Sequence, residues 1–286
     1  MATVAAALAE ARARGVDRLD AQLMLAAIFG VGRSALIAHE DRPLPIEARE
    51  RWTRWLDRRV EGEPLAYLLG TKEFHGLELE VNAAVLVPRP ETELLVDWAL
   101  ELVGAMPDAG GESVGRGVQS ILDLGTGSGA IALAVKQACP GATVTATDAS
   151  AAALGVARRN ARRLALEVDF QETSWWQGLE GRQFSIAIAN PPYIRDGDAA
   201  LAALRHEPRT ALTPGGDGLA ALREIVAGAP AHLAPGGWLL LEHGFDQAGD
   251  VRALVVGAGL EAVETRFDLA GHPRASGGRR GPAPAR

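Results

Sequence analysis

The sequence has very little cysteine and no long apolar run, and each shortage excludes a class of protein. Cys139 is the one cysteine among 286 residues, so no disulfide can form within the chain, and a reducing, cytoplasmic location is expected. No apolar run approaches the ~18 residues that a membrane-spanning helix needs. The first residues lack the charged-then-apolar order of a signal peptide. We therefore expect no membrane partner.

Lysine is also scarce, since it occurs only at Lys72 and Lys136 and arginine supplies nearly all 29 basic residues. This preference extends over the whole chain, so arginine content is poor evidence for nucleic-acid binding. The net charge of -7 and the pI of about 5.5 argue against a protein that follows a phosphate backbone. No direct nucleic-acid contact is expected. The six scattered histidines and the one cysteine suggest no metal site.

The length and a hydrophobic content of 48% predict one large domain and one small one. Residues 1–73 have the pattern of short helices, and Asp20 is expected to cap a helix from Ala21 to Phe29. A second helix starts at Pro45. Four apolar residues recur on one of its faces at helical spacing and are assigned to packing: Trp52, Trp55, Leu56 and Val60.

The period of the pattern changes to two residues after Phe74. Leu77, Leu79 and Val81 alternate with acidic residues, and a second strand is expected at Val85–Val87, so residues 74–90 are predicted to form a hairpin linker. Residues 91–276 alternate between strand and helix patterns, which predicts an α/β fold with a doubly wound, mostly parallel, seven-stranded sheet of Rossmann-like type. Residues 277–286 are predicted to be a disordered tail.

A glycine-rich loop follows the first strand of this sheet and opens a helix. It reads Asp123-Leu124-Gly125-Thr126-Gly127-Ser128-Gly129-Ala130. Glycines allow close approach of a ligand, and the helix start offers free N–H groups. Asp148 follows the next strand, where a carboxylate accepts hydrogen bonds from ribose hydroxyls. The loop also satisfies the dinucleotide fingerprint G-x-G-x-x-A, so alone it indicates only an adenosine-type ligand.

Asp123 favours one of these ligands. A carboxylate at the end of the strand would repel a pyrophosphate, but it can serve the ammonium group of S-adenosylmethionine. The segment Asn190-Pro191-Pro192-Tyr193 follows another apolar strand, at the edge of the sheet where open α/β folds bind ligands. Two acceptors, the Asn190 side-chain oxygen and the Pro191 carbonyl, would there face the hydrogens of an amide nitrogen. Tyr193 would wall the pocket by aromatic contact.

Four segments together resemble a known family. "DLGTGSGAIALA" is similar to the first motif of class I S-adenosylmethionine-dependent methyltransferases, and "NPPY" to the catalytic motif of amino-group methyltransferases. "VPRPETE" (87–93) and "EPRTALTPGGDGL" (207–219) are narrower and resemble the peptide-chain release-factor glutamine N5-methyltransferases. The resemblance extends from the helical amino-terminal segment to about Arg274. The Gly-rich insert at 104–117 and the tail match nothing in it.

The resemblance implies methyl transfer from S-adenosylmethionine to the glutamine of the Gly-Gly-Gln motif in class I release factors, with the helical domain helping to hold that protein. A monomer is expected. The positions it implies for the cofactor are Asp123, Gly125, Thr126, Gly127, Ser128, Gly129, Asp148, Trp175 and Asn190, with Trp176 as an alternative to Trp175. The catalytic positions are Asn190, Pro191 and Tyr193; those for the substrate are Arg89, Glu91, Asn190, Pro191, Pro192 and Tyr193.

Two alternatives stay open at this point. A DNA or RNA adenine methyltransferase can use the same Asn-Pro-Pro-Tyr motif, although a DNA enzyme should add a basic target-recognition region, which this sequence lacks. Another protein amide is also a possible substrate. A third alternative is a non-enzymatic protein that binds the cofactor and has kept only the fold. Such a protein would not need the Asn190 side-chain amide beside the cofactor.

Overall fold

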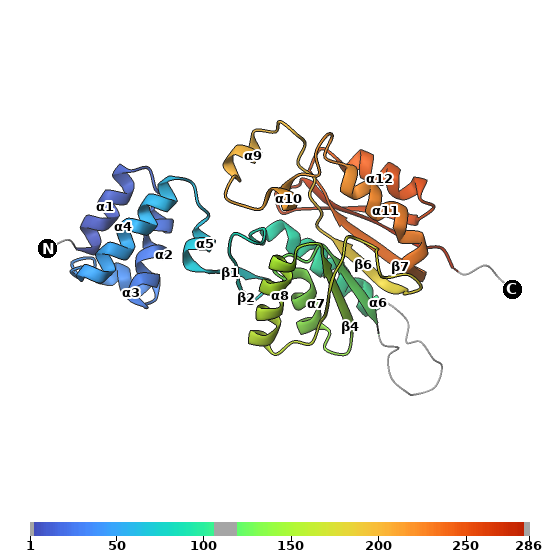
Figure 1. The fold of residues 1–286 in the computed structure, drawn as a ribbon, viewed down its shortest axis with the longest axis horizontal. Helices are drawn as coiled ribbons and strands as arrows, with labels where there is room; N and C mark the ends of the chain where they lie inside the picture. The colour runs from blue at the N-terminus through green and yellow to red at the C-terminus, as the bar shows by residue number, and fades with distance from the viewer. Residues whose placement is uncertain (1–2, 106–118, 283–286) are drawn as a thin grey trace. The chain divides into compact units, whose positions relative to one another are not determined.

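The computed structural model describes residues 3–105 and 119–282, which divide into two units, Met1–Lys72 and Glu73–Arg286 (Figure 1). The first unit is helical: α1 (Val4–Ala13), α2 (Arg18–Phe29), α3 (Arg33–Ala38), α4 (Ile46–Val60) and α5 (Leu65–Leu69). Its core includes Met24 and Leu25 of α2 and the predicted Trp52, Trp55 and Leu56 of α4. The packing role predicted for the two tryptophans is therefore confirmed.

Two details of this unit differ from the prediction. The cap of α2 is Asp17, whose side chain accepts a hydrogen bond from the Leu19 N–H at 2.7 Å. Asp20 lies within the first turn, where its carboxylate accepts from Arg59 at 2.8 Å. Val60 is 44% exposed because it ends α4, beyond the buried face.

The linker forms a hairpin at a different place from the predicted one. Strand β1 (Thr71–Phe74) pairs with β2 (Leu77–Glu80), so the partner of β2 precedes it. His75 and Gly76 between them have φ of 48° and 76°, as a tight hairpin turn requires. The strand predicted at Val85–Val87 is wrong: the segment is irregular, and the Val87 N–H donates to the Glu207 carboxylate at 2.9 Å.

The second unit is built on a seven-stranded sheet, which confirms the predicted fold class. In sequence order its strands are β3 (Ser120–Leu124), β4 (Thr143–Asp148), β5 (Asp169–Glu172), β6 (Phe184–Ala189), β7 (Leu233–Glu242), β8 (Glu261–Phe267) and β9 (Pro273–Arg279). Their spatial order is β5-β4-β3-β6-β7-β9-β8. The pairings among β3 to β7 are parallel, and β9 runs antiparallel to both of its neighbours.

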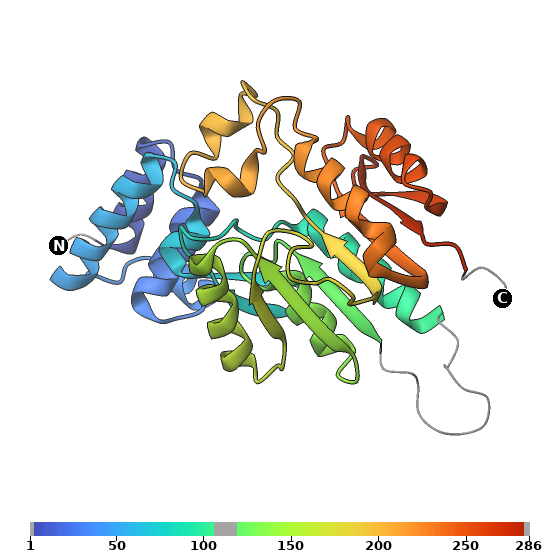
Figure 2. The same ribbon diagram turned by 45° about the vertical axis from the view of Figure 1, so that its right-hand side comes forward.

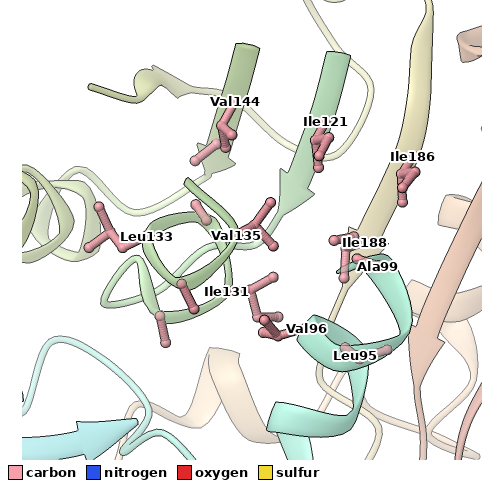
Figure 3. Close-up of a cluster of buried hydrophobic side chains, with 14 of the residues drawn as sticks. Leu95, Val96, Ala99, Ile121, Ile131, Leu133, Val135, Val144, Ile186 and Ile188 are labelled. Carbon is pink, nitrogen blue, oxygen red and sulfur yellow. The ribbon is translucent and has the colours of Figure 1, made fainter. Parts of the chain in front are cut away.

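Helices cover both faces of the sheet, as Figure 2 shows for the green and the orange-red helices. The helices of this unit are η1 (Pro90–Thr92), α6 (Glu93–Ala105), α7 (Ala130–Ala138), α8 (Ala151–Leu164), α9 (Ala200–Ala203), α10 (Arg209–Leu212), α11 (Ala220–His232) and α12 (Ala248–Gly257). On one face α6 and α7 bury apolar side chains against the strands; Figure 3 shows Val96 and Ile131 facing Ile121 and Ile188. On the other face α11 and α12 pack against β6 and β7.

The predicted tail and the predicted insert each overlap with a regular element of this unit. Strand β9 continues to Arg279 and buries Gly277 and Gly278, so the disordered tail predicted from residue 277 is wrong over its first residues. These glycines sit in the strand because a side chain at Gly277 would collide with the Leu239 carbonyl at 2.6 Å. Helix α6 includes positions 104 and 105 of the predicted insert. The rest of the insert and residues 283–286 lie outside the described residues.

Candidate functional site

The register of the central strands brings the predicted site residues to one edge of the sheet. Leu124 of β3 pairs with Thr147 of β4 on one side and with Ala189 of β6 on the other. The residues that follow, Gly125, Asp148 and Asn190, therefore leave the sheet next to one another. Between β3 and β6 the order of the strands reverses. This is the switch point at which open α/β sheets bind ligands.

A cavity of about 380 Å³ opens at this edge. That volume lies in the range of small-molecule sites, roughly 300–1,000 Å³. The predicted cofactor and substrate residues that line it are Arg89, Gly125, Thr126, Gly127, Ser128, Asp148, Trp175, Asn190 and Pro192. Asp123, Gly129, Glu91, Pro191 and Tyr193 are not among the lining residues, so any part they play is indirect or depends on how a substrate enters.

The glycine loop is held by its backbone. The N–H groups of Gly125 and Thr126 both donate to the Thr147 carbonyl, at 2.9 and 2.8 Å. Gly127 has a φ of 57°, in the left-handed region that favours glycine. A side chain at Gly129 would place its Cβ 3.0 Å from Leu133 and 3.3 Å from Ala157. The loop is thus shaped for close approach of a ligand to its backbone.

Asp148 closes one side of the loop. Its Oδ2 accepts a hydrogen bond from the Gly127 N–H at 2.9 Å and its Oδ1 accepts from the Ser150 N–H at 2.8 Å. Burial raises the pKa of Asp148, while these two backbone donors act in the opposite direction. Each carboxylate oxygen has a further lone pair. The side chain lines the cavity and can accept from hydroxyl groups of a ligand.

Asp123 lies beneath the loop and is almost fully buried. Its Oδ2 accepts from the Thr126 hydroxyl at 2.5 Å and from the Ala132 N–H at 3.2 Å. Its Oδ1 has no hydrogen-bond partner among the described residues. Burial raises the pKa of Asp123 to about 7. An unsatisfied buried carboxylate oxygen beside a cavity is suited to a cationic ligand group, reached directly or through water.

The two adjacent tryptophans have different places. Trp175 lines the cavity, and its ring lies 3.3 Å from where a Cβ on Gly125 would be. Trp176 is buried in the core, where its ring N–H donates to the Ile225 carbonyl at 2.9 Å and its ring stacks on His232. Trp175 is therefore the one positioned to contact a ligand.

The Asn-Pro-Pro-Tyr segment contributes Asn190 and Pro192 to the same cavity. The Asn190 side-chain NH₂ donates to the Thr92 hydroxyl at 3.0 Å, which leaves the Asn190 Oδ1 as an acceptor. The Tyr193 hydroxyl donates to Glu242 at 3.2 Å. Burial and the nearby Glu242 raise the pKa of Tyr193, so its hydroxyl keeps its proton. Tyr193 packs partly against the apolar cluster that α11 and α12 form with β6 and β7.

The two narrow sequence signatures meet at this cavity. Arg89 of the first forms an ion pair with Glu207 of the second, and Glu207 is 1% exposed at its side chain. Glu91 is exposed. Gly218 of the second signature has a φ of 79°, and a Cβ there would lie 2.3 Å from the Tyr193 carbonyl oxygen. The signatures therefore fix the surroundings of the Asn-Pro-Pro-Tyr segment.

Sequence reasoning missed two residues of this site, Thr92 and Glu242. Thr92 lies within the VPRPETE signature (87–93), but the sequence assigned it no role. Glu242 ends β7, whose end agrees with the strand predicted at Trp238–Glu242 although β7 starts earlier, at Leu233. An acidic residue at the carboxyl end of a parallel strand was an available signal. Within residues 3–105 and 119–282, no group of three histidine, cysteine or acidic side chains could hold a metal ion. The helices of these same ranges are all too short or too polar to cross a membrane.

Comparison with known proteins agrees with this arrangement. The PrmC N-terminal domain matches residues 1–70, and the methyltransferase small domain matches residues 112–219. Release factor glutamine methyltransferases of Burkholderia pseudomallei and Bordetella pertussis are 48% and 47% identical to this chain. The first alignment covers 94% of each chain; the second covers 92% of this one and 95% of the relative.

A solved structure supports the fold independently of close sequence similarity. The crystal structure of a methyltransferase from Pyrococcus furiosus has a TM-score of 0.52 at 18% identity, covering 80% of this chain and 99% of that one. At this level of identity the similarity concerns the fold alone. The two close relatives, by contrast, match nearly the whole length of both units, and on that evidence the chain belongs to the release factor glutamine methyltransferase family.

Proposed function

We propose that this chain transfers a methyl group from S-adenosylmethionine to the side-chain amide nitrogen of the glutamine in the Gly-Gly-Gln motif of class I release factors. The observation that carries the proposal is that residues predicted for the cofactor and a residue predicted for the substrate amide line one cavity. Gly127, Asp148 and Trp175 are among the former, and Asn190 is the latter. Family membership supports the same substrate.

The residues present suit S-adenosylmethionine. Asp148 has free lone pairs for ribose hydroxyls, Trp175 offers an aromatic face for the adenine, and the unpartnered Oδ1 of Asp123 suits the ammonium group. When bound, this cofactor supplies an electrophilic methyl group. We assign the remaining chemistry to the chain's own residues. The Asn190 side-chain oxygen and the Pro191 carbonyl accept hydrogen bonds from the two N–H groups of the substrate amide, and Tyr193 limits the movement of that amide. One of the two protons leaves to water after the methyl transfer.

The proposal is tested by methyl transfer from labelled S-adenosylmethionine. We expect label on a class I release factor and none on the same factor with its Gly-Gly-Gln glutamine replaced by glutamate. Duplex DNA and an RNA hairpin with exposed adenines serve as competing substrates. Label on either nucleic acid, or on the substituted release factor, would contradict the proposed substrate.

The helical unit is proposed to recognise the protein substrate rather than to take part in the chemistry. Its own core supports this, because the unit is built separately from the sheet that carries the cavity. A truncated chain should start at Gly70, so that β1 is kept as the partner of β2. We expect it to bind S-adenosylmethionine with unchanged affinity and to lose at least about tenfold in kcat/KM for the intact release factor. Unchanged kcat/KM in a folded truncation would exclude this role.

Arg89 and Glu91 are proposed to face the substrate. We expect Arg89→Ala and Glu91→Ala to lower turnover more than thermal stability. Arg89→Ala also removes the ion pair with Glu207 and leaves that buried carboxylate unpaired. We therefore expect this variant to lose about 1–3 kcal/mol of folding stability as well. Exposed Glu91 has no ion-pair partner within residues 3–105 and 119–282, so Glu91→Ala should keep its Tm. Parallel losses of Tm and turnover in Glu91→Ala would instead indicate a role only in starting the helix.

The functional state is proposed to be a monomer in the cytoplasm. The cavity is lined on several sides by segments of this one chain, so the proposed chemistry needs no residue from a second copy, and the proposed substrate acts in translation. Sedimentation of the protein alone and with a release factor tests the first part.

A further inference from the structure

A buried carboxyl group lies directly behind the Asn-Pro-Pro-Tyr segment and has no part in the proposed chemistry so far. Glu242 is the last residue of β7 and is 2% exposed. Ala189 of β6 pairs with Leu241 of β7, so Asn190 and Glu242 are the next residues of two adjacent strands. A buried acid at this position is costly unless its neighbours interact with it.

Two hydroxyl groups face this carboxyl group. The Tyr193 hydroxyl donates to Oε1 at 3.2 Å. The other oxygen, Oε2, has no hydrogen-bond partner among the described residues. The Thr92 hydroxyl is near enough to lower the Glu242 pKa, so it is the neighbouring donor available to Oε2. Both hydroxyls belong to segments that border the cavity.

The hydrogen bonds through Thr92 have a direction. A threonine hydroxyl has one hydrogen and two lone pairs, and one lone pair of Thr92 already accepts from the Asn190 NH₂ at 3.0 Å. Its hydrogen is then available to Glu242. An ionised carboxylate can only accept, so the partnerless Oε2 of Glu242 favours the orientation in which Thr92 donates its hydrogen to it. Thr92 then accepts from Asn190. The Asn190 NH₂ group therefore points at Thr92, and the Asn190 side-chain oxygen points away from it.

We propose that Glu242 is a positioning residue that sets the direction of the hydrogen bonds through Thr92 to Asn190 and holds the Tyr193 hydroxyl, so that the Asn190 oxygen faces the substrate amide. This inference rests on the proposed function. Glu242 touches neither cofactor nor substrate and acts through Thr92 and Tyr193.

If Glu242 acts through its charge, kcat should depend on pH. Burial raises the pKa of Glu242 to about 7, and Glu91 on η1 adds to the rise. The hydroxyls of Thr92 and Tyr193 and the positive charge of Arg274 on β9 act in the opposite direction. Below this pKa the carboxyl group carries its own hydrogen and accepts less well from both hydroxyls. We therefore expect kcat to rise as pH increases through about 7.

The first test is Glu242→Gln, which keeps the shape and replaces one acceptor oxygen by an NH₂ donor. The expected result is a fall in kcat of about tenfold, comparable to the loss of one well-placed hydrogen bond. KM for the release factor and Kd for S-adenosylmethionine should stay within about twofold of wild type. The rise of kcat near pH 7 should disappear. Because the variant removes a buried carboxyl group, its Tm should not fall.

The second test is a matched pair at Thr92. Thr92→Val removes the hydroxyl at nearly constant shape, and Thr92→Ser keeps it. We expect the valine variant to lose about tenfold in kcat and the serine variant to stay within about threefold of wild type. The double variant with Glu242→Gln should lose much less than the product of the two single losses, because both act on one network.

The outcomes separate this inference from the proposed function. A wild-type protein that does not methylate the release factor overturns the proposed function and this inference together. An active wild type with unchanged kcat and pH profile in Glu242→Gln overturns the inference alone. So does a Glu242→Gln variant that loses kcat, cofactor affinity and Tm in parallel, since that pattern indicates a purely structural role.

Discussion

Replacing Asn190 with alanine is expected to lower kcat for the release-factor glutamine by about 100-fold or more, the size of effect seen when one preorganised hydrogen-bonding partner is removed. An amide nitrogen is a poor nucleophile, because its lone pair is delocalised into the carbonyl group, the resonance that also makes the peptide bond planar. The site must therefore stabilise a transition state in which this nitrogen is pyramidal and partly positive. Acceptors aimed at its two hydrogens do this.

The structure gives Asn190 the orientation that this role needs. Its NH₂ donates to Thr92 at 3.0 Å, so its oxygen is the atom left to accept from a substrate. Pro191 and Pro192 each fix φ near −65°, which limits movement of the Pro191 carbonyl. The Tyr193 carbonyl accepts from the Gln247 side chain at 3.0 Å, which ties the end of the segment to α12's start. Positioning of this kind lowers a barrier without any general base.

The measurement is single-turnover methylation at saturating cofactor, with cofactor Kd and Tm determined on the same preparation. We expect Kd to change by less than about threefold, because Asn190 acts mainly in the transition state. Asn190→Asp is the matched variant: it keeps the size and an acceptor oxygen, but an ionised carboxylate cannot donate to Thr92. Near-normal kcat in Asn190→Ala would contradict the catalytic role and indicate that the segment is only a turn after β6.

The elements that could be predicted from the sequence are those that a local sequence pattern determines. The apolar run of β3, the glycine loop and α7 follow one another between residues 120 and 138, and each has its own pattern of spacing or of glycine. The sequence pattern predicts strands at Ser120–Leu124 and Phe184–Ala189 and helices at Ala130–Ala138 and Ala151–Leu164, and β3, β6, α7 and α8 have these bounds. The hairpin before them was misplaced because Val85–Val87 has strand-like residues, while its N–H at Val87 is used by Glu207, 120 positions away.

Contacts between distant segments account for what was missed at the site. Asn190 and Thr92 are 98 positions apart, and Arg89 and Glu207 are 118 apart. No local pattern indicates which hydroxyl a side-chain amide will meet across such a distance. Gly218 shows the same limit, because its need for glycine arises from the carbonyl oxygen of Tyr193 in another segment. The resemblance located these segments, but only the structure shows that they hold one another.

Replacing Asp148 with alanine is expected to weaken binding of S-adenosylmethionine by about 1.5–3 kcal/mol, the usual size of a hydrogen bond to a charged group. That loss corresponds to about a 10- to 150-fold increase in Kd. Both carboxylate oxygens already accept one backbone N–H each, from Gly127 and from Ser150. The alanine variant therefore also loosens the loop, and a weaker Kd alone does not separate the two causes.

A cofactor analogue separates them. S-adenosylhomocysteine and its 2′-deoxy analogue are titrated by calorimetry into wild type and Asp148→Ala. If Asp148 accepts from the ribose hydroxyls, removing the 2′-hydroxyl should weaken binding to wild type by about tenfold and binding to the variant by less than about twofold, because interacting groups are not additive. Asp169→Ala is the charge control: Asp169 is an exposed acid on neighbouring β5 that does not line the cavity, so both ligands should bind that variant as they bind wild type. Equal losses for the deoxy analogue in wild type and Asp148→Ala would show that Asp148 only supports the glycine loop, and unchanged binding of S-adenosylmethionine itself to Asp148→Ala would exclude it from the cofactor site.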